Sequence, residues 1–162
     1  MLESDIANQL KTKLPELSLD WVVAEKGDSA LFVPADKTVE VASALKSDPA
    51  LSMDFLMNLS AFDEKEHIEV TYHFYSYKHR HKLNIKVKAA RGGGVVASLC
   101  SVYGTANFQE REVFDHFGVT FSAHPDMRRI LLPDDWVGFP LLKDYQEQEE
   151  YNGIGTTRPP LL

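Results

Sequence analysis

The residue types that could carry covalent chemistry are a single cysteine, Cys100, and six histidines. A cysteine acts as a nucleophile only as a thiolate, which requires a nearby base or cation. Cys100 is flanked by Leu99 and Val102 without a local nucleophile signature, so we expect a small core side chain. One alternative stays open, a stand-alone enzyme that uses a histidine or Cys100. It predicts turnover or bound metal in the isolated chain.

The histidines lack the spacing of a metal centre. Structural zinc sites pair cysteines or histidines at short intervals, and many catalytic ones use His-Glu-x-x-His; the sequence contains neither pattern. His79 and His81 would share one face of an extended segment, but they fall at the tip of an expected hairpin, where polar residues are usual. We therefore predict that the chain has no metal site and no catalytic residue of its own.

A glycine run, Arg91-Gly92-Gly93-Gly94, separates an expected strand from an expected helix. Backbone N–H groups at such a position can cradle a phosphate. The run lacks the Gly-Lys-Ser/Thr end of a P-loop and the Gly-x-Gly-x-x-Gly spacing of a dinucleotide fold, so we predict a flexible connection. A lone cysteine also excludes an iron–sulfur cluster held by this chain alone, because such clusters need about four ligands.

The richest constellation of charge lies in the last third of the chain. Its charged side chains are interleaved with aromatic and aliphatic ones, which predicts that several are partly buried. Buried arginines need carboxylate partners, so a helix and the loop after it are expected to form a bidentate ion-pair network that fixes the loop. Aromatic residues and arginine are also enriched at interfaces. The charged members are Arg111, Arg128, Arg129, Lys143, Glu110, Glu112, Asp115, Asp126, Asp134, Asp135 and Asp144.

The elements that must position this constellation are predicted from apolar spacing and from turn and cap residues. The N-terminal part is expected to contain a helix over 4–14, strands over 17–24 and 30–33, a helix over 37–46 capped by Asp36, and a helical turn and then a strand over 51–62.

The clearest pattern is a hairpin. Residues 67–75 and 83–89 each alternate between apolar and polar side chains. One register pairs the apolar residues on one face and sets Glu69 opposite Lys88 on the other, which a stable hairpin needs. This is typical of an antiparallel pair that helices cover on one side. The apolar pairs are Phe74 with Leu83, Tyr72 with Ile85 and Val70 with Val87.

Beyond the hairpin, residues 96–103 are predicted to be helical. A further helix is expected from about Ala106 to His116, with Gly118 as its C-terminal stop.

The character of the chain changes after Val137. Prolines, glycines and an acidic run leave no helical or strand period, and such a segment cannot build its own core. We therefore divide the chain into a domain over 1–136 and an arm over 137–162, which is either disordered or extended along a partner.

The overall composition excludes some classes of function. A net charge of −7 argues against broad nucleic-acid binding, which needs clustered basic residues. The chain has no run of about 18 apolar residues, so no membrane-spanning helix is expected. Its start, Met-Leu-Glu-Ser-Asp-Ile, is not that of a signal peptide. If the protein works at a membrane, other chains must hold it there.

The segment 106–145 closely resembles the signature region of the 30 kDa-type family, designated C among the subunits of respiratory complex I, the proton-pumping NADH:quinone oxidoreductase. Three positions depart from the family pattern: Ala123 stands where a glycine is frequent, Leu142 where an arginine is frequent, and Phe108 where a tryptophan is common. The matching residues are Glu110-Arg111-Glu112, Phe114-Asp115, Phe117-Gly118, His124-Pro125-Asp126, Arg128-Arg129-Ile130-Leu131, Asp135-Trp136, Gly138, Pro140-Leu141 and Lys143-Asp144-Tyr145.

The resemblance implies an α+β two-layer domain, with helices packed on a mostly antiparallel or mixed sheet and an extended C-terminal arm. It also implies a structural subunit of the peripheral arm, which docks to the hydrogenase-large-subunit-like subunit of the quinone module. Flavin and iron–sulfur clusters would lie in partner subunits, and the chain would be peripheral on the cytoplasmic face of the inner membrane. Implied interface and loop-fixing residues are Glu110, Arg111, Asp115, His124, Pro125, Arg128, Arg129, Trp136, Lys143 and Asp144.

A nearer alternative is the equivalent subunit of a membrane-bound hydrogenase or of a dehydrogenase with another electron donor. A subunit of this kind does not touch the donor, so the residues do not distinguish these relatives. The enzyme activity would in either case belong to the complex, and the isolated chain would not be catalytic.

Overall fold

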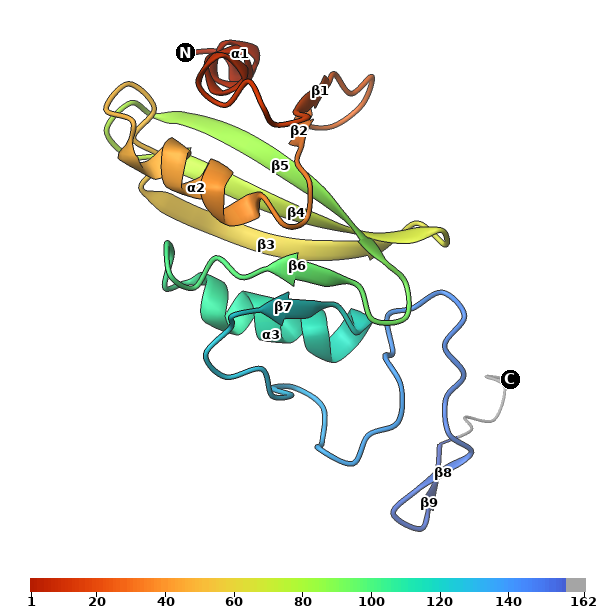
Figure 1. Ribbon diagram of the computed structural model, residues 1–162. Coiled ribbons are helices and arrows are strands. Elements are labelled where there is room, and N and C mark those ends of the chain that lie inside the picture. The colour runs from red at the N-terminus through yellow and green to blue at the C-terminus, as the bar shows by residue number, and fades with distance from the viewer. Residues whose placement is uncertain (157–162) are drawn as a thin grey trace.

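The computed structural model describes residues 1–156, which form three helices and a mixed five-stranded sheet with two smaller strand pairs (Figure 1). The expected α+β fold is confirmed. The elements are α1 (Glu3–Lys13), β1 (Asp20–Val22), β2 (Ala30–Phe32), α2 (Thr38–Ser47), β3 (Phe55–Asp63), β4 (His67–Ser76), β5 (His81–Ala90), β6 (Val95–Ala97), α3 (Ala106–Phe117), β7 (Thr120–Ser122), β8 (Glu150–Tyr151) and β9 (Ile154–Gly155).

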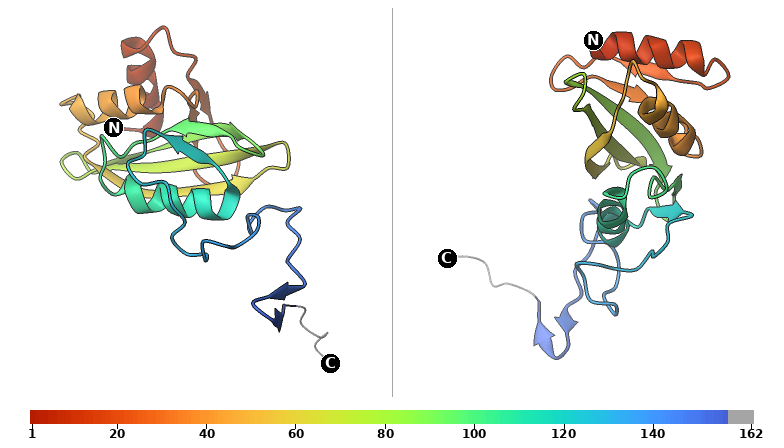
Figure 2. Two further views of the ribbon diagram at one scale, coloured as in Figure 1. Left: turned by 60° about the horizontal axis from the view of Figure 1, so that its bottom comes forward. Right: turned by 90° about the vertical axis from the view of Figure 1, so that its left-hand side faces the viewer.

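The main sheet has the strand order β1-β2-β5-β4-β3. Only β2 and β5 are parallel within it; the other neighbours are antiparallel. Helix α1 contacts β5, while α3 lies along β3 (Figures 1 and 2). The apolar residues of β4 and β5 that alternate along the strands are buried in the main core, whereas the opposite face of the sheet carries polar side chains.

The predicted hairpin register is confirmed at every pair. Phe74 is opposite Leu83, and Glu69 is opposite Lys88. The N-terminal elements also fall where the periodicity places them, and β3 ends at Asp63, one residue beyond the expected Phe62. Strong alternation therefore fixed both the element and its register.

The predicted helix over 96–103 is wrong. Residues Val95–Ala97 form β6, which pairs in parallel with β7, and Val96 is opposite Phe121. The N–H of Ser98 continues the pairing by donating to the Ser122 carbonyl at 3.0 Å. This partner lies more than twenty residues away, so local spacing could not reveal that the segment would pair as a strand.

The predicted cap at Asp36 is also wrong. Helix α2 begins at Thr38, and Lys37 occupies the cap position without a capping side-chain bond. The Thr38 hydroxyl donates to the Ala97 carbonyl at 2.8 Å, and Thr38 is buried. A tertiary contact with β6 thus fixes the start of α2 in place of a local cap.

Helix α3 ends as expected at Gly118, which has a φ of 74°. A Cβ atom at this position would come within 2.6 Å of the Phe139 ring, so the glycine serves both the left-handed turn and the close approach of the arm.

None of the helices in the described part of the chain, residues 1–156, has the length and apolar character needed to cross a membrane.

Candidate interface site around the third helix and the arm

Helix α3 carries two fully buried carboxylates, and Asp115 is the more heavily bonded. One of its oxygens, Oδ2, accepts hydrogen bonds from the N–H groups of Ile130, Leu131 and Leu132 at 3.1, 2.8 and 2.9 Å. The other, Oδ1, accepts from Arg129 Nη1 at 2.6 Å. Burial alone would raise the pKa of Asp115, but these donors lower it to about 2.

The Arg129 guanidinium extends this contact toward the arm. Its Nη1 also donates to the Asp115 carbonyl at 3.1 Å, and its Nη2 donates to the carbonyls of Trp136 and Gly138 at 3.0 and 3.1 Å. The guanidinium lies 5.4 Å from the centre of the Phe139 ring. We call Asp115, Arg129 and the backbone of 130–138 that they bind the Asp115 cluster; it holds a long segment without regular secondary structure against α3.

Arg111 supports the same loop through carbonyl groups. Its Nε donates to the Arg128 carbonyl at 3.0 Å and its Nη2 to the Arg129 carbonyl at 2.9 Å. The nearest carboxylate, that of Asp126, is 3.8 Å away and is bound in bidentate fashion by Arg128. The bidentate ion pair of this loop is therefore local and exposed, while Arg111 mainly satisfies backbone oxygens.

His124 fixes the start of the loop. Its Nδ1 accepts the Asp126 N–H at 2.9 Å, so the proton lies on Nε2, which donates to the Asn107 carbonyl at 3.0 Å. Pro125 lies between them, exposed at the turn. Ala123 precedes the turn with a φ of 61°, a left-handed conformation in which a Cβ atom is strained.

Glu110, the second buried carboxylate, faces the segment after β6. It accepts from the Leu99 N–H at 2.7 Å, the Ser98 hydroxyl at 2.6 Å and the Cys100 thiol at 3.5 Å. Burial raises the pKa of Glu110 above its ordinary value. The carboxylate therefore links α3 to the loop that the sequence had predicted as a helix.

Cys100, Glu110 and His124 come together in space, with one potential ligand atom from each within 4.8 Å of the others. Sequence spacing gave no sign of this. Burial raises the pKa of the Cys100 thiol to about 11, so the thiol is protonated and a poor nucleophile near neutral pH. Both nitrogens of His124 and both oxygens of Glu110 are already hydrogen-bonded, which suits a structural contact better than a metal centre.

A second group of charges fixes the beginning of the arm. Asp63, buried at the end of β3, accepts the Lys143 N–H at 2.8 Å and Arg91 Nη2 at 2.9 Å. Arg91 also binds Asp144 through two hydrogen bonds, at 2.5 and 3.2 Å. The Lys143 ammonium lies 4.4 Å from the centre of the Phe62 ring. We call Asp63, Arg91, Lys143 and Asp144 the Asp63 cluster.

The far part of the arm turns back toward the Asp115 cluster. Trp136 packs on Tyr151 with ring centres 5.2 Å apart, and the Tyr151 hydroxyl donates to Asp135 at 2.8 Å. Strands β8 and β9 form a short hairpin here. The arm over 137–156 is thus extended and contacts the domain at several points.

The predicted site residues therefore form three groups. Most of them, including Trp136, surround α3 and the loop after it, Glu110 faces the segment after β6, and Lys143 and Asp144 lie at the end of the main sheet. Sequence reasoning missed Asp63, Arg91 and Asn107. An arginine beside three glycines at a strand end was the only available signal for Arg91, because its partners are 28 and 53 residues away.

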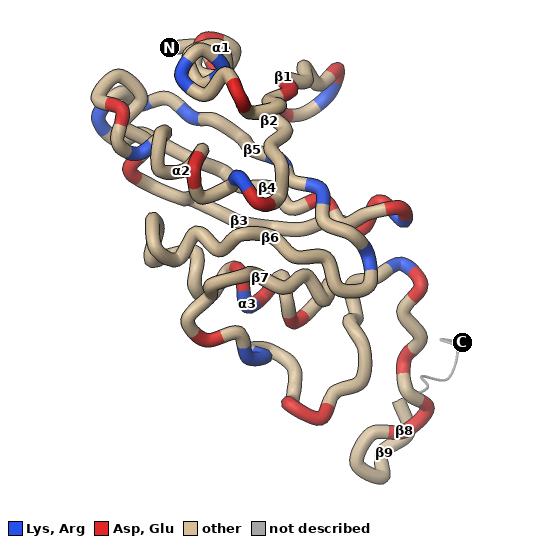
Figure 3. The backbone as a smooth tube through the Cα atoms, viewed as in Figure 1, with Lys and Arg blue, Asp and Glu red and all other residues tan. Residues whose placement is uncertain are grey.

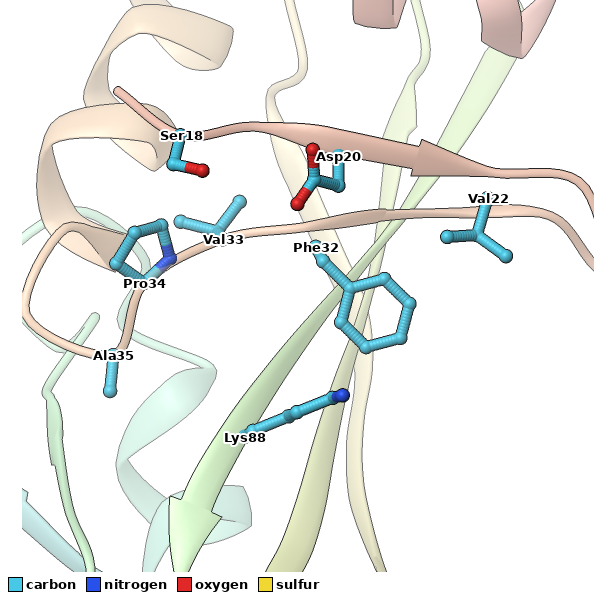
Figure 4. A pocket seen from close by; sticks show the side chains of 8 residues that line it. All are labelled: Ser18, Asp20, Val22, Phe32, Val33, Pro34, Ala35 and Lys88. Carbon is cyan, nitrogen blue, oxygen red and sulfur yellow. The ribbon is translucent and has the colours of Figure 1, made fainter. Parts of the chain in front are cut away.

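A hollow of about 420 Å³ lies at the other end of the sheet, between β1, β2 and β5 (Figure 4). The Lys88 side chain points toward the Phe32 ring, with the ammonium 5.2 Å from its centre. None of the predicted site residues line it; the lining consists of Ser18, Asp20, Val22, Phe32, Val33, Pro34, Ala35 and Lys88.

Comparison with known proteins decides the family. Residues 31–151 match the family described as "Respiratory-chain NADH dehydrogenase, 30 Kd subunit". The subunit designated C of the NADH-quinone oxidoreductase of Moorella thermoacetica is 43% identical over 141 residues, covering 85% of this chain and 94% of that protein. The chain belongs to this family. The resemblance inferred from residues 106–145 is thereby confirmed.

Two solved structures share the fold. Nqo5, solved as a trypsin-resistant fragment, has a TM-score of 0.63 at 22% identity, with 76% of this chain and 97% of that chain covered. A chain of the membrane-bound sulfane sulfur reductase, an archaeal respiratory membrane complex, has a TM-score of 0.63 at 24% identity, covering 82% of this chain and 77% of that chain. Both likenesses show the α+β architecture found here.

Proposed function

We propose that this chain is a structural subunit of the peripheral arm of a proton-pumping NADH:quinone oxidoreductase. It holds no flavin, iron–sulfur cluster or catalytic residue, and its contribution to electron transfer is to fix the module that carries the quinone site. The observation that carries the proposal is the Asp115 cluster. Its buried charges bind backbone groups and so stabilise the shape of an extended surface, which is the requirement of a docking element.

The surface that this cluster shapes is suited to a protein partner. The large apolar side chains of Leu131, Val137 and Leu141 are each more than half exposed, and Phe108 on α3 is 64% exposed. Exposed apolar groups among fixed polar ones are typical of interaction sites. We propose that this surface and the arm beyond it dock to the hydrogenase-large-subunit-like subunit.

Charge on the arm would guide this docking. The last described part of the arm carries Glu147, Glu149 and Glu150, and Figure 3 shows acidic positions spread along the arm down to β8. An acidic segment favours a basic surface on the partner and speeds encounter with it. Through such partners the chain would lie at the cytoplasmic face of the inner membrane.

A second candidate is the equivalent subunit of a related membrane-bound complex with another donor or acceptor. The fold shared with the archaeal sulfane sulfur reductase favours it. Both candidates use the same docking surface and differ only in the rest of the complex. The proteins that copurify with the chain would separate them.

The test is a mild-detergent pull-down of the tagged chain from its native membranes. Full-length protein is compared with a 1–145 truncation, which keeps the Asp63 cluster, and with a 1–136 truncation, which lacks it. We expect the full-length chain to retain a hydrogenase-like subunit and iron–sulfur proteins, and both truncations to lose them. A full-length chain that remains solitary and soluble would refute the proposal, and the stand-alone interpretation would then be favoured.

A further inference from the structure

The polar face of the main sheet contains a hollow that the docking proposal does not use. Its volume is about 230 Å³. The lining side chains come from the three central and edge strands β3, β4 and β5, and from the loop between β1 and β2. They are Asp28, Ser60, Thr71, His73, Asn84 and Lys86, and all of them are polar.

The hollow results from the register of the sheet. Ser60 is opposite Thr71, and Thr71 is opposite Lys86, so these residues form one row across three strands. Longer side chains occupy the neighbouring rows, with the His73–Asn84 pair on one side and the Glu69–Lys88 pair on the other. Two short hydroxyl side chains between rows of longer ones leave a depression lined by hydrogen-bonding groups.

Asn84 sets the state of the imidazole in this hollow. Asn84 is only 2% exposed, and its Nδ2 donates to the Ser29 carbonyl at 3.3 Å. Its Oδ1 therefore faces His73 Nδ1, at 2.8 Å, and can only accept a hydrogen bond. His73 Nδ1 must carry the proton, which leaves the Nε2 lone pair as an acceptor.

The charged groups of the hollow are only partly used. Lys86 binds Glu69 at 2.7 Å, which leaves further ammonium hydrogens available. Asp28 is neutralised by Lys82, whose ammonium is 2.8 Å away. Within residues 1–156, the hydroxyls of Ser60 and Thr71 have no protein partner. The hollow thus offers two hydroxyls and an ammonium as donors beside a single imidazole acceptor.

We propose that this hollow binds a phosphoryl group that keeps a P–OH, as inorganic phosphate or a phosphomonoester does. The unprotonated oxygens accept from Ser60, Thr71 and Lys86, and the P–OH donates to His73 Nε2. A carboxylate or a sulfate has acceptors only near neutral pH and leaves the imidazole lone pair unpaired. The site is independent of the docking surface, since it shares no residue with the Asp115 or Asp63 clusters.

The proposal is tested by titrating the isotope-labelled full-length chain with inorganic phosphate and following the histidine rings by NMR. We expect a saturable shift of His73 Nε2, and sulfate binding weaker by about tenfold, the value of one hydrogen bond to a charged group. Thr71→Val, which keeps the shape of the side chain, should weaken phosphate binding by about tenfold. A His73 ring that does not respond, or equal binding of sulfate, overturns the proposal.

The matched control is His67→Gln. His67 lies on the same strand and the same face of β4 but outside the hollow, so this change should leave phosphate binding intact. Unfolding temperatures of both variants confirm that they fold. Loss of binding in His67→Gln, with the fold retained, would show that phosphate is attracted by general charge and would overturn the assignment to the hollow.

The source of the phosphoryl group is settled by vesicles. Sedimentation of the chain with vesicles that contain phosphatidic acid but not with pure phosphatidylcholine, lost in Thr71→Val, assigns a lipid headgroup to the hollow. Binding of inorganic phosphate without sedimentation assigns a soluble ligand. Sedimentation that Thr71→Val leaves unchanged contradicts a lipid site in the hollow.

Discussion

The Asp115 and Asp63 clusters anchor the same C-terminal segment by similar means but with different protection from water. Each has a buried aspartate that accepts backbone N–H groups and binds one arginine. Around Asp115 the arginine side chain is 14% exposed and is enclosed by carbonyl groups. Around Asp63 the arginine is 25% exposed, and its second carboxylate, Asp144, is 69% exposed.

The difference shows which contact is permanent and which can open. Removing one partner from an enclosed pair leaves a charge that water cannot reach, whereas an exposed pair is replaced by water at little cost. The Asp115 cluster should therefore hold the loop over 130–138 in every state of the protein. The Asp63 cluster sets the direction of the arm and could release it when a partner binds.

The largest expected effect is that of Asp115→Ala. The change leaves Arg129 without its carboxylate and three buried N–H groups without an acceptor. Breaking a buried, hydrogen-bonded pair costs about 3–5 kcal/mol. Urea denaturation of the full-length chain should show this loss in the free energy of unfolding.

The control is Asp126→Ala, in the same loop. Asp126 pairs with Arg128, which is 75% exposed, so the expected cost is at most about 1 kcal/mol. Equal losses in the two variants would mean that the Asp115 cluster has no special protection.

Asp63→Ala should have a smaller effect, about 2 kcal/mol, because water can reach Arg91 and replace part of the lost contact. Asp144→Ala, which removes only the exposed partner, should cost less than about 1 kcal/mol. Hydrogen exchange at the Lys143 N–H should increase in Asp63→Ala, while exchange at Leu131 should not. Coupled increases at both positions would show that the two clusters open as one unit.

Acid should reveal the Asp115 contribution directly. The folded protein has an Asp115 pKa of about 2, below the ordinary 3.8, so the carboxylate stabilises the fold above 3.8 and this stability is lost as the pH falls toward 2. The difference corresponds to about 2 kcal/mol. The free energy of unfolding measured between pH 5 and pH 2 should fall less steeply in Asp115→Asn than in the natural chain. Parallel slopes in the two proteins would contradict the lowered pKa.

Comparison of two segments shows how far the sequence could lead. The β4–β5 hairpin was predicted with its register because alternation on both faces is a local property of the chain. The β6 strand was missed because its partner β7 lies beyond a helix, and three residues carry too little pattern. Regular elements with strong periodicity are thus predictable, and short strands that depend on a distant partner are not.

The same distinction holds within the candidate site. The residues that gather on α3 and the following loop were chosen from charge among apolar residues and from family motifs, and the structure brings most of them together. Their actual partners were not predictable, because Arg111 and Arg129 bind carbonyl oxygens, which every residue has. Asp63 was missed because a single aspartate at a strand end is indistinguishable from a solvated one.

The smallest effect sharpens the comparison from the loop side. Ala123 has a φ of 61°, where an L residue is strained and glycine is not. Ala123→Gly should therefore stabilise the chain by up to about 1 kcal/mol, offset in part by the greater freedom of glycine in the unfolded state. Thermal unfolding measures the gain, and Gly118→Ala is the opposite control, since its Cβ would meet Phe139 at 2.6 Å. If Ala123→Gly destabilises instead, the turn before His124 is held by the Asp115 cluster firmly enough that its backbone strain costs little.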